Sequence, residues 1–466
     1  MALSLSESTG NMEQENSCLS EVDSLHTGGD TKSEEKRIDS HAAVQKNSLY
    51  LDSMQSNTQK DRTTKNDLKR HRKCIFIMSW SGRPIYSYYH GEAQVASLMS
   101  IFTSLISIVS LKNDDIQYFK AGETILAFKM VGPVWLVYVS TTGRPVELIF
   151  RQLDTLYLQL LFILTDRVST HLNTRPQLDV RQFLEGNDKY MDGLVRWTSK
   201  DLAYALGCIH PYVLDQTVRE ELFKLLQKEC SEDMLYVLIV ARGRLVQFMN
   251  QRQVTPLKPI DIHLLIQFIQ YTEAFSYGES SLCPVCLPTH DSHNYLNLYI
   301  ASTGFKINLV ILSSVIGKQD SLFKRECRLF KKLKSSDLLN HFSDDSNQYY
   351  DVKEVCVPGL YHFLFKLSAL VQMTMPRFST PYHVDSEKKR LKRLYQYCIA
   401  KAGDKKNSRG MFSILTEYEL AVCQVTAEYE LYAIFGVTES RKGCTQRLNS
   451  IVKWVMRESK KLFIKH

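Results

Sequence analysis

Apolar residues show no regular spacing over the first 70 positions of the chain and a clear spacing over almost everything that follows. The opening stretch is rich in Ser, Asn, Gln and Glu and has few large apolar side chains. Such a segment cannot bury enough surface to offset the entropy that it would lose on ordering. We therefore predict a disordered tail over residues 1–70, with folded structure beginning near Cys74.

Short apolar runs separated by turn-forming Gly and Pro predict strands, and apolar residues three and four positions apart predict helices. In the first patterned region these rules predict, in order, strands at 74–78 and 85–88, a helix at 92–111, strands at 115–119, 124–130 and 134–140, and a helix at 145–166. This order, β-β-α-β-β-β-α, is typical of an antiparallel sheet with helices on its faces.

A similar order recurs twice. The second region predicts strands at 234–240 and 245–250, a helix at 261–271, strands at 295–301 and 306–312, and a helix at 319–333. The third predicts strands at 361–366 and 371–375, a helix at 387–400, strands at 411–417 and 428–435, and a helix at 445–462, which leaves it with only four strands. We therefore expect an α/β chain of the α+β type, with a tail (1–70), a first domain (71–185), a helical connector (186–230), a second domain (231–345) and a third domain (346–466).

The composition agrees with a folded, multidomain protein. Of the 466 residues, 44% are hydrophobic and 23% are charged, which is ordinary for globular chains. No uninterrupted apolar run is long enough for a membrane-spanning helix, and the first residues lack the basic start and apolar core of a secretory signal. The 11 cysteines are scattered without the spacing of a disulfide framework. We expect a cytoplasmic protein with reduced thiols.

The sequence contains no familiar motif of catalysis. It has no G-x-x-x-x-G-K-[ST] phosphate loop, no G-x-S-x-G elbow and no H-E-x-x-H metal site. The 13 histidines are dispersed, and a lone one such as His263 or His362 is more often a structural residue than a general base. We therefore predict no catalytic residue, no cofactor and a protein that is not an enzyme.

One segment carries four residues of the types that zinc accepts: Cys283, Cys286, His290 and His293. Finger-like sites separate their two ligand pairs by about a dozen residues, so that the chain can wrap around the metal. Here three residues lie between the pairs, and Pro288 is one of them. The spacing favours a strand that ends at a proline-bounded turn, and we expect no metal.

The helix predicted over Glu92–Leu111 has no charged side chain between Ala93 and Leu111. A helix that covers one side of a sheet normally exposes Lys and Glu on its other side. Here the face opposite the apolar stripe carries only uncharged residues, namely Ser97, Ser100, Ile101, Ser104, Ser107 and Ile108. An uncharged helix face of this kind is typical of a surface that is buried against protein. That protein is either a partner or another domain of this chain.

The net charge of +8 is unevenly distributed. The tail holds 9 basic and 12 acidic residues, whereas residues 385–466 hold 17 basic and 9 acidic ones. This excess indicates an anionic partner. The chain shows neither a groove-reading helix nor aromatic residues interleaved with exposed cations, so we expect no nucleic acid.

An anionic membrane surface is the other candidate, because each basic residue near such a surface contributes about 1 kcal/mol. A solvated helix face is the simpler reading for any single one of these residues. The candidate membrane-contact residues are Lys388, Lys389, Arg390, Lys392, Arg393, Lys405, Lys406, Lys453, Lys460 and Lys461.

Several stretches of the chain form a recognisable set. Cys74–Ser87 is an apolar strand and a small turn followed by Gly-Arg-Pro-Ile-Tyr-Ser. Further along lie LIVARGRL at 238–245, DIHL at 261–264, PVCLP at 284–288, YHFLFK at 361–366, ELYA at 430–433 and Trp454. In this order they resemble the Mon-one (SAND) family of vacuolar and endosomal fusion proteins, in which lysine is usual at the position of Arg83. The tail and residues 320–351 do not contribute to the resemblance.

The resemblance implies three longin domains, which agrees with the repeated β-β-α-β-β-β-α order. It also implies pairing with the Ccz-one subunit through the first longin domains of both proteins. Together the two would form a guanine nucleotide exchange factor for the Rab-seven GTPase, recruited to endosomes and vacuoles or lysosomes by phosphatidylinositol-3-phosphate and other anionic lipids. Exchange works by differential binding of GTPase states, so it requires no catalytic triad.

On this basis we expect the helix at 92–111 and the adjoining edge strand at 115–119 to form the platform for the Ccz-one subunit and the GTPase. The residues assigned to it are Ser97, Ser100, Ile101, Ser104, Ser107, Ile108, Ile116 and Tyr118. The alternative is a longin scaffold or adaptor in membrane trafficking that does not catalyse exchange. Tighter binding of the nucleotide-free GTPase than of its GDP form would distinguish the two.

Overall fold

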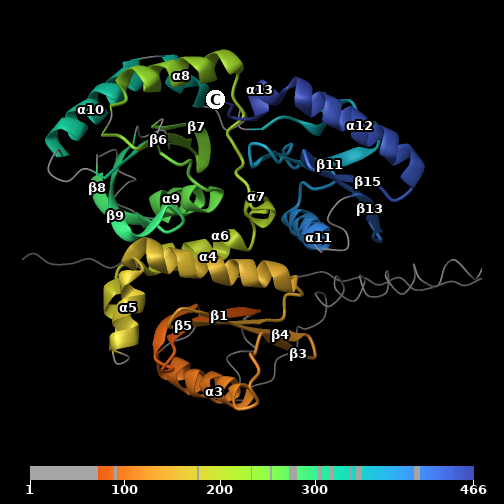
Figure 1. Ribbon diagram of the computed structural model, residues 1–466. Coiled ribbons are helices and arrows are strands. Elements are labelled where there is room, and N and C mark those ends of the chain that lie inside the picture. Colours follow the sequence, from red (N-terminus) through yellow and green to blue (C-terminus); the bar gives the residue numbers. More distant parts are fainter. Residues whose placement is uncertain are drawn as a thin grey trace, which may run out of the picture. The chain divides into compact units, whose positions relative to one another are not determined.

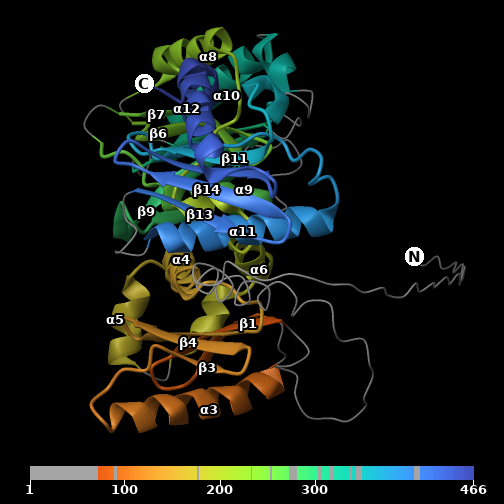
Figure 2. The same ribbon diagram turned by 90° about the vertical axis from the view of Figure 1, so that its right-hand side faces the viewer.

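The computed structural model describes residues 72–88, 92–175, 178–231, 233–251, 254–271, 281–302, 307–314, 319–335, 337–342, 349–403 and 410–465. Three five-stranded antiparallel sheets follow one another along these residues, each with helices on its faces (Figures 1 and 2). The expected α+β fold is therefore confirmed. The tail expected over residues 1–70 lies outside the described residues.

The first sheet has the spatial order β2-β1-β5-β4-β3. Its strands are β1 (Lys73–Ser79), β2 (Pro84–Tyr88), β3 (Tyr118–Ala121), β4 (Thr124–Val131) and β5 (Val134–Ser140). Side chains alternate between the two faces of a strand, so β1 serves two cores. Phe76 and Met78 pack against helix α3 (Glu92–Ser110), whereas Ile75 and Ile77 pack on the face of α4 (Val146–Leu164).

A helical connector leads from the first sheet to the second. It contains α5 (Arg167–Thr174), the 3-10 helix η1 (Val180–Leu184), α6 (Asp188–Thr198), α7 (Leu202–Leu206) and α8 (Gln216–Glu229). Helix α4 is buried along most of its length because it contacts strands of its own sheet together with α6, α9, α11 and β8. Among the described helices none alone is long and apolar enough to cross a membrane; only α4 and α5 considered together, which bend by 92° at their junction, reach that threshold.

The second sheet has the order β7-β6-β10-β9-β8. Its elements are β6 (Tyr236–Ala241), β7 (Arg244–Asn250), α9 (Pro259–Tyr271), β8 (Ser281–Leu287), β9 (Asp291–Ser302), β10 (Ile307–Ser313), α10 (Gln319–Ser335) and the 3-10 helix η3 (Asp337–Phe342). Leu222 of α8 and Leu329 of α10 pack on one face of this sheet. Leu265 of α9 packs on the other face, in a core that continues into the first domain.

The third sheet has the order β12-β11-β15-β14-β13. Its elements are the 3-10 helix η5 (Val352–Val355), β11 (Leu360–Leu367), β12 (Gln372–Thr374), α11 (Asp385–Gly403), β13 (Gly410–Leu415), β14 (Glu419–Val425), β15 (Tyr429–Gly436), α12 (Arg441–Arg457) and α13 (Ser459–Leu462). Helix α11 packs on one face, with Tyr395 against Cys423, and α12 packs on the other, with Leu448 against Val422.

The expectation of only four strands in the third copy is wrong, because β14 is the fifth. This strand is buried on both faces, so it lacks the alternation of apolar and polar residues that marks a half-exposed strand. It also begins with a charged residue, Glu419, whose carboxylate accepts hydrogen bonds from Tyr382 Oη at 3.1 Å and from Arg390 Nη1 at 2.6 Å. Only the tertiary structure supplies those partners.

Candidate functional site

The outer face of α3 is exposed, and no other described segment covers it. Val95, Met99 and Phe102 on its inner face are buried in the core beneath. On the outer face Ile101 and Ile108 are 52% and 57% exposed. The serines of this face are also exposed, namely Ser97, Ser100, Ser104 and Ser107. Both ribbon views show α3 with the sheet on one side only (Figures 1 and 2). The sequence allowed either a partner or another domain of this chain to cover this face. No other described part of the chain covers it.

Hydroxyl groups on α3 are directed back to their own helix. Ser100 Oγ donates to Ala96 O at 3.2 Å, Ser104 Oγ donates to Ser100 O at 2.9 Å, and Thr103 Oγ1 donates to Met99 O at 2.8 Å. Such internal bonds satisfy the donors without a partner. Another protein can therefore cover Ser100, Thr103 and Ser104 without leaving their hydroxyl donors unpaired.

The turn between β1 and β2 lies against this face. Together they form a hollow of about 540 Å3, lined by Ser81, Gly82, Ser100, Thr103, Ser104, Ser107 and Ile108. Gly82 has φ +83°, and a Cβ there would lie 2.9 Å from Thr103 Oγ1, so the turn requires glycine. Trp80 in the same turn is 47% exposed. We define the α3 surface as Ser97, Ser100, Ile101, Ser104, Ser107 and Ile108, with the exposed Trp80 as its candidate extension.

The two residues expected on the adjoining edge strand do not extend this surface. Strand β3 is at the edge of the sheet, as expected, but it begins at Tyr118. Tyr118 is paired with Ala127, whose side chain lies in the core on the α4 side, and paired residues share a face. Tyr118 is thus on the opposite side of the sheet from α3. Ile116 is half-buried and packs against the core beneath α3, so it supports the helix rather than presenting a contact.

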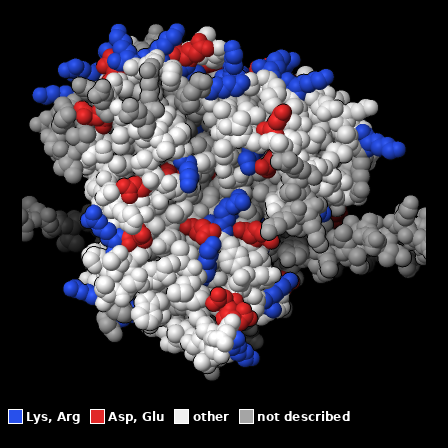
Figure 3. Space-filling model, in the orientation of Figure 1, with Lys and Arg blue, Asp and Glu red and all other residues white. Residues whose placement is uncertain are grey.

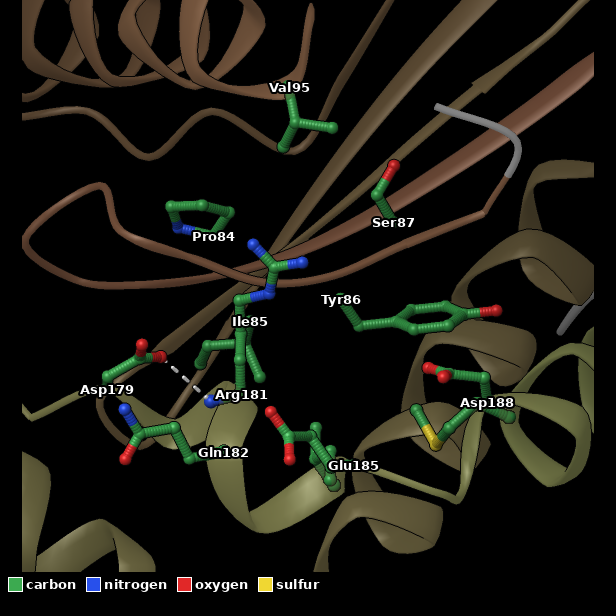
Figure 4. A pocket seen from close by; sticks show the side chains of 12 residues that line it. Pro84, Ile85, Tyr86, Ser87, Val95, Asp179, Arg181, Gln182, Glu185 and Asp188 are labelled. Atoms are coloured by element: carbon green, nitrogen blue, oxygen red, sulfur yellow. Dashed lines mark hydrogen bonds between the residues drawn. The ribbon is translucent and has the colours of Figure 1, made fainter. Parts of the chain in front are cut away.

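A second hollow, of about 440 Å3, lies between β2, the start of α3 and the segment around η1 (Figure 4). Asp179, Glu185 and Asp188 contribute carboxylates to its lining. Asp179 Oδ1 accepts from Arg181 N at 3.1 Å, and Tyr86 Oη donates to Asp192 Oδ1 at 2.6 Å. None of its lining residues is a His or a Cys, so the hollow has no nucleophile–base pair of the usual kind.

The basic residues assigned to membrane contact are not gathered on one surface. Lys388, Lys389, Arg390, Lys392 and Arg393 lie on α11, whereas Lys453, Lys460 and Lys461 lie on α12 and α13, which pack on the opposite face of the third sheet. Lys405 and Lys406 lie outside the described residues.

Several α11 cations also have partners within the chain. Arg390 forms ion pairs with Glu387 and Glu419, and Lys388 Nζ lies 3.3 Å from Asp385 Oδ1. Lys392 Nζ lies 5.5 Å from the centre of the Phe378 ring, and burial lowers its pKa. An ion-paired, partly buried cation is a poor contact for lipid, so α11 is the weaker half of the expected membrane site.

Exposed cations instead line the helices at the far side of the second and third sheets. Helices α8, α10 and α12 run along the top of both ribbon views, and Lys and Arg side chains are frequent along the same edge of the space-filling view (Figures 1, 2 and 3). The exposed basic residues of these helices and of α13 are Lys224, Lys228, Lys324, Arg328, Lys331, Lys332, Lys442, Lys453, Arg457 and Lys460. Two of them form ion pairs, Lys332 with Glu229 and Arg457 with Glu458. We call this set the basic crest.

Two of the four zinc-type residues, Cys286 and His290, have other partners. Cys286 Sγ donates to Asp291 O at 3.3 Å, and His290 Nδ1 lies 3.1 Å from Tyr236 Oη. Burial raises the pKa of Cys286 to about 12, which keeps the thiol protonated. Across the described parts of the chain, no three His, Cys, Asp or Glu side chains are grouped as a metal site requires.

Comparison with known proteins identifies the repeated domain. Models of the first, second and third longin domains of FUZ, MON1 and HPS1 match residues 73–194, 232–331 and 359–459. "Vacuolar fusion protein MON1 homolog A" of Gallus gallus is 26% identical over 89% of this chain and 76% of the relative. "Protein SAND" of Takifugu rubripes is 26% identical over 88% and 80%. "Vacuolar fusion protein MON1" of Yarrowia lipolytica is 27% identical over 84% and 74%.

The chain belongs to the MON1 (SAND) family of triple-longin proteins. The resemblance drawn from the sequence is therefore confirmed, and so is its implication of three longin domains. Membership places the protein in a family of membrane trafficking whose named members are vacuolar fusion proteins.

Sequence reasoning missed two parts of the candidate surfaces of this MON1 family member. Trp80 precedes a Ser-Gly-Arg-Pro turn, and an aromatic residue in a turn is a sign of exposure that could have been used. The cations of α10 were visible as a charged helix at 319–333. Their place along the same side of the molecule as α8 and α12 (Figure 1) was not visible, because residues far apart in the sequence are brought together only by the packing of the domains.

Proposed function

We propose that this chain is one subunit of a heterodimeric guanine nucleotide exchange factor, with the Ccz-one protein as its partner and the Rab-seven GTPase as its target. The exposed outer face of α3 carries the proposal. It combines two large apolar side chains with four serines and no charge, a composition typical of the core of a protein interface rather than of solvated surface.

Exchange by such a complex rests on binding and not on a reacting side chain. A factor that binds the nucleotide-free GTPase more tightly than the GDP-bound one shifts the population toward release of GDP. A first domain with an exposed α3 surface and no motif of catalysis is compatible with that mode of action. In this proposal the α3 surface pairs with the first longin domain of the Ccz-one protein, and the composite of the two receives the GTPase.

Recruitment to endosomes and vacuoles or lysosomes is the second part of the proposal, and it supports early-to-late endosome maturation. The basic crest is the part of the described chain best suited to anionic lipid such as phosphatidylinositol-3-phosphate. Its cations are exposed and come from helices of two domains, so many of them can approach one flat surface, each contributing about 1 kcal/mol.

Release of fluorescent GDP from Rab-seven tests the proposal. The chain co-expressed with the Ccz-one protein should accelerate release, whereas the chain alone should not. Vesicles carrying phosphatidylinositol-3-phosphate should increase the rate further, and K453Q/K460Q should lose that increase while keeping the rate in solution. A well-formed complex that leaves GDP release unchanged would contradict exchange on this GTPase.

A non-exchanging longin scaffold or adaptor is the alternative function, since the same α3 surface would also serve to bind a partner. The discriminating measurement is the affinity of the complex for nucleotide-free and for GDP-bound GTPase. Equal affinities would favour the scaffold, because a protein that does not distinguish the two states cannot shift their populations.

A further inference from the structure

Arg144, in the turn before α4, is a buried cation with no carboxylate partner among the described residues. It is only 8% exposed. Its Nη1 donates to Gln152 Oε1 at 2.7 Å and its Nη2 donates to Thr198 O at 3.0 Å, while its Nε has no hydrogen-bond partner. Buried charges in proteins are normally paired with an opposite charge, so this guanidinium leaves a positive field uncompensated.

Lys73, the first residue of β1, belongs to the same hydrogen-bond network. Its Nζ donates to Ser199 Oγ at 2.7 Å and to Val195 O at 3.2 Å. Gln152 Nε2 lies 3.4 Å from the same Ser199 oxygen, which connects Lys73 to Arg144. Burial, and then the charges of Arg144, Lys200 and Arg196, lower the pKa of Lys73 to about 7.

The remaining cations are at the surface. Arg196 and Lys200 are exposed at the end of α6, and Arg72 is exposed next to Lys73. Asp201 follows Lys200 in the chain, and the negative end of the α6 dipole adds about half an elementary charge; together they cannot balance the four cations Lys73, Arg144, Arg196 and Lys200. Positive charge therefore exceeds negative charge at this point, where the first domain meets α6.

The site also touches the third domain. Gln396 of α11 donates from Nε2 to Ser199 O at 3.1 Å. Burial and the charge of Arg72 lower the pKa of Arg393 on the same helix. Segments from β1, the turn before α4, α6 and α11 thus converge at one place, so a ligand bound there would connect the first domain to the third.

We propose that the cationic cluster of Lys73, Arg144, Arg196 and Lys200 is a binding site for a compact, multiply charged phosphate ligand of the inositol phosphate class. Arg196 and Lys200 contact the phosphates from the surface, and Lys73 lies beneath them within the network. Arg144 stays buried and contributes its field. A ligand that concentrates several negative charges in a small volume matches such a cluster of cations. The site is separate from the α3 surface and does not depend on the proposed exchange activity.

Calorimetric titration of the full chain with inositol hexakisphosphate tests the proposal. Arg196 and Lys200 form no described ion pair, so R196Q/K200Q should fold normally and bind the probe at least tenfold more weakly. The matched control K112Q/R175Q removes two exposed cations that lie outside both the cluster and the basic crest, and it should bind as the original chain does. Absence of binding by the original chain, or equal loss in both double variants, would overturn the proposal.

Proton uptake gives a readout that a surface patch alone would not produce. The groups that face the Lys73 amine are Tyr88 from β2, Arg144 from the turn before α4, and Arg196, Ser199 and Lys200 from α6 and its end. At pH 8 the amine is mostly neutral, and a bound phosphate should raise its pKa and protonate it. Titrations in buffers of different ionisation enthalpy should show about one more proton taken up by the original chain than by K73R, because protons exchanged by the phosphates of the probe cancel in the difference. K73R should still bind the probe, and equal proton exchange in the two chains would overturn the proposal.

The source of the phosphate is decided by a competition. If vesicles carrying a phosphoinositide displace the soluble probe from the original chain, and R196Q/K200Q loses the soluble probe while the basic crest still binds the vesicles, the site takes a lipid head group. If such vesicles do not compete while R196Q/K200Q still loses the soluble probe, the ligand is a soluble inositol phosphate. Both results support the site. Displacement that is unchanged in R196Q/K200Q and lost in K453Q/K460Q would place phosphate binding on the basic crest and overturn it.

Discussion

Helices α3 and α9 occupy the same place in consecutive copies of one fold and share a scarcity of charge, but they differ in what covers them. In α9 eight residues are buried, including Leu264 and Leu265, because α6 and α4 pack against that helix. In α3 the corresponding outer face is exposed, with Ile101 and Ile108 more than half accessible. An uncharged outer face is thus explained within the chain for α9 and is not explained by any described residue for α3.

The polar residues of the two helices also differ in whether other segments of the chain supply their hydrogen-bond partners. Asp261 of α9 accepts a hydrogen bond from the Thr289 hydroxyl, and His263 Nε2 lies 2.9 Å from Cys208 O. Both groups are satisfied by other segments of the chain, and burial shifts the pKa of each toward its neutral form. Ser100 and Ser104 of α3 donate only to their own helix. Helix α11, in the third copy, is partly covered by α7 and α4, and the part that stays exposed carries charge at Lys389.

The largest expected effect breaks the α3 surface itself. S100R/S104R should abolish binding of the Ccz-one partner, weakening it by at least about 3 kcal/mol, because two unpaired charges would have to be buried in the interface. Co-purification and a binding isotherm measure the loss, and circular dichroism checks the fold. S386R, at an exposed serine of α11, is the matched control and should bind normally. A complex that survives S100R/S104R would show that this face is not the partner site.

The next effect is on the free energy of unfolding, and it distinguishes a helix covered by its own chain (α9) from a helix that is exposed in the free chain (α3). L264A on α9 should reduce the free energy of unfolding by about 2–5 kcal/mol, because it opens a cavity in a fully buried site. I108A on α3 should change it by less than about 0.5 kcal/mol, since the side chain is exposed. Urea unfolding of the two variants measures the difference. Equal losses would mean that Ile108 is covered in the free chain.

A smaller effect tests whether the β1–β2 turn belongs to the α3 surface. W80A should weaken partner binding by about 1–3 kcal/mol, the range found for aromatic residues at the centre of interfaces. Its free energy of unfolding should hardly change, because nearly half of the side chain is already exposed. F183A, at an aromatic side chain of η1 with 56% exposure, is the control and should leave binding unchanged. An identical affinity for W80A would restrict the surface to α3 alone.

The smallest effect concerns the pH dependence of stability that the partly buried amine of Lys73 causes. The pKa of Lys73 is lowered from 10.5 to about 7 in the folded protein, so the folded state binds fewer protons than the unfolded state between these values. Stability must therefore rise with pH over that window. Between pH 7 and pH 9, the free energy of unfolding of the original chain should rise by on the order of 1–2 kcal/mol more than that of K73M. Denaturant unfolding at several pH values measures the gain, and parallel profiles would show that the amine is not buried as described.

Much of the fold was predictable because each domain repeats local signals. Strand β5 was predicted with its observed bounds, and α3 and α4 to within two residues, since their apolar spacing is strong and their ends carry Pro and Gly. Strand β14 was missed because a strand buried on both faces has no alternation to read. Strand β3 was placed three residues early, because a short edge strand has few buried positions to define it.

The candidate site was predicted in part. The outer face of α3 follows directly from helical spacing, and its residues lie together as expected. Tyr118 was assigned to the same surface, but the pleat of β3 directs it to the other side of the sheet, a matter of register that sequence alone does not define. The basic residues of α11 were grouped with those of α12 because both are near the C-terminus, whereas the third sheet separates them.

By itself, the sequence determined that the chain has three copies of one β-β-α-β-β-β-α unit and that one of their helices has an uncharged outer face. These properties depend on apolar residues spaced two, three or four positions apart, and such spacings can be read from the local sequence. The tertiary structure decided which helix face is covered, which cations come together and which buried charge lacks a partner. Those outcomes depend on contacts between segments that are tens to hundreds of residues apart, and no local pattern records them.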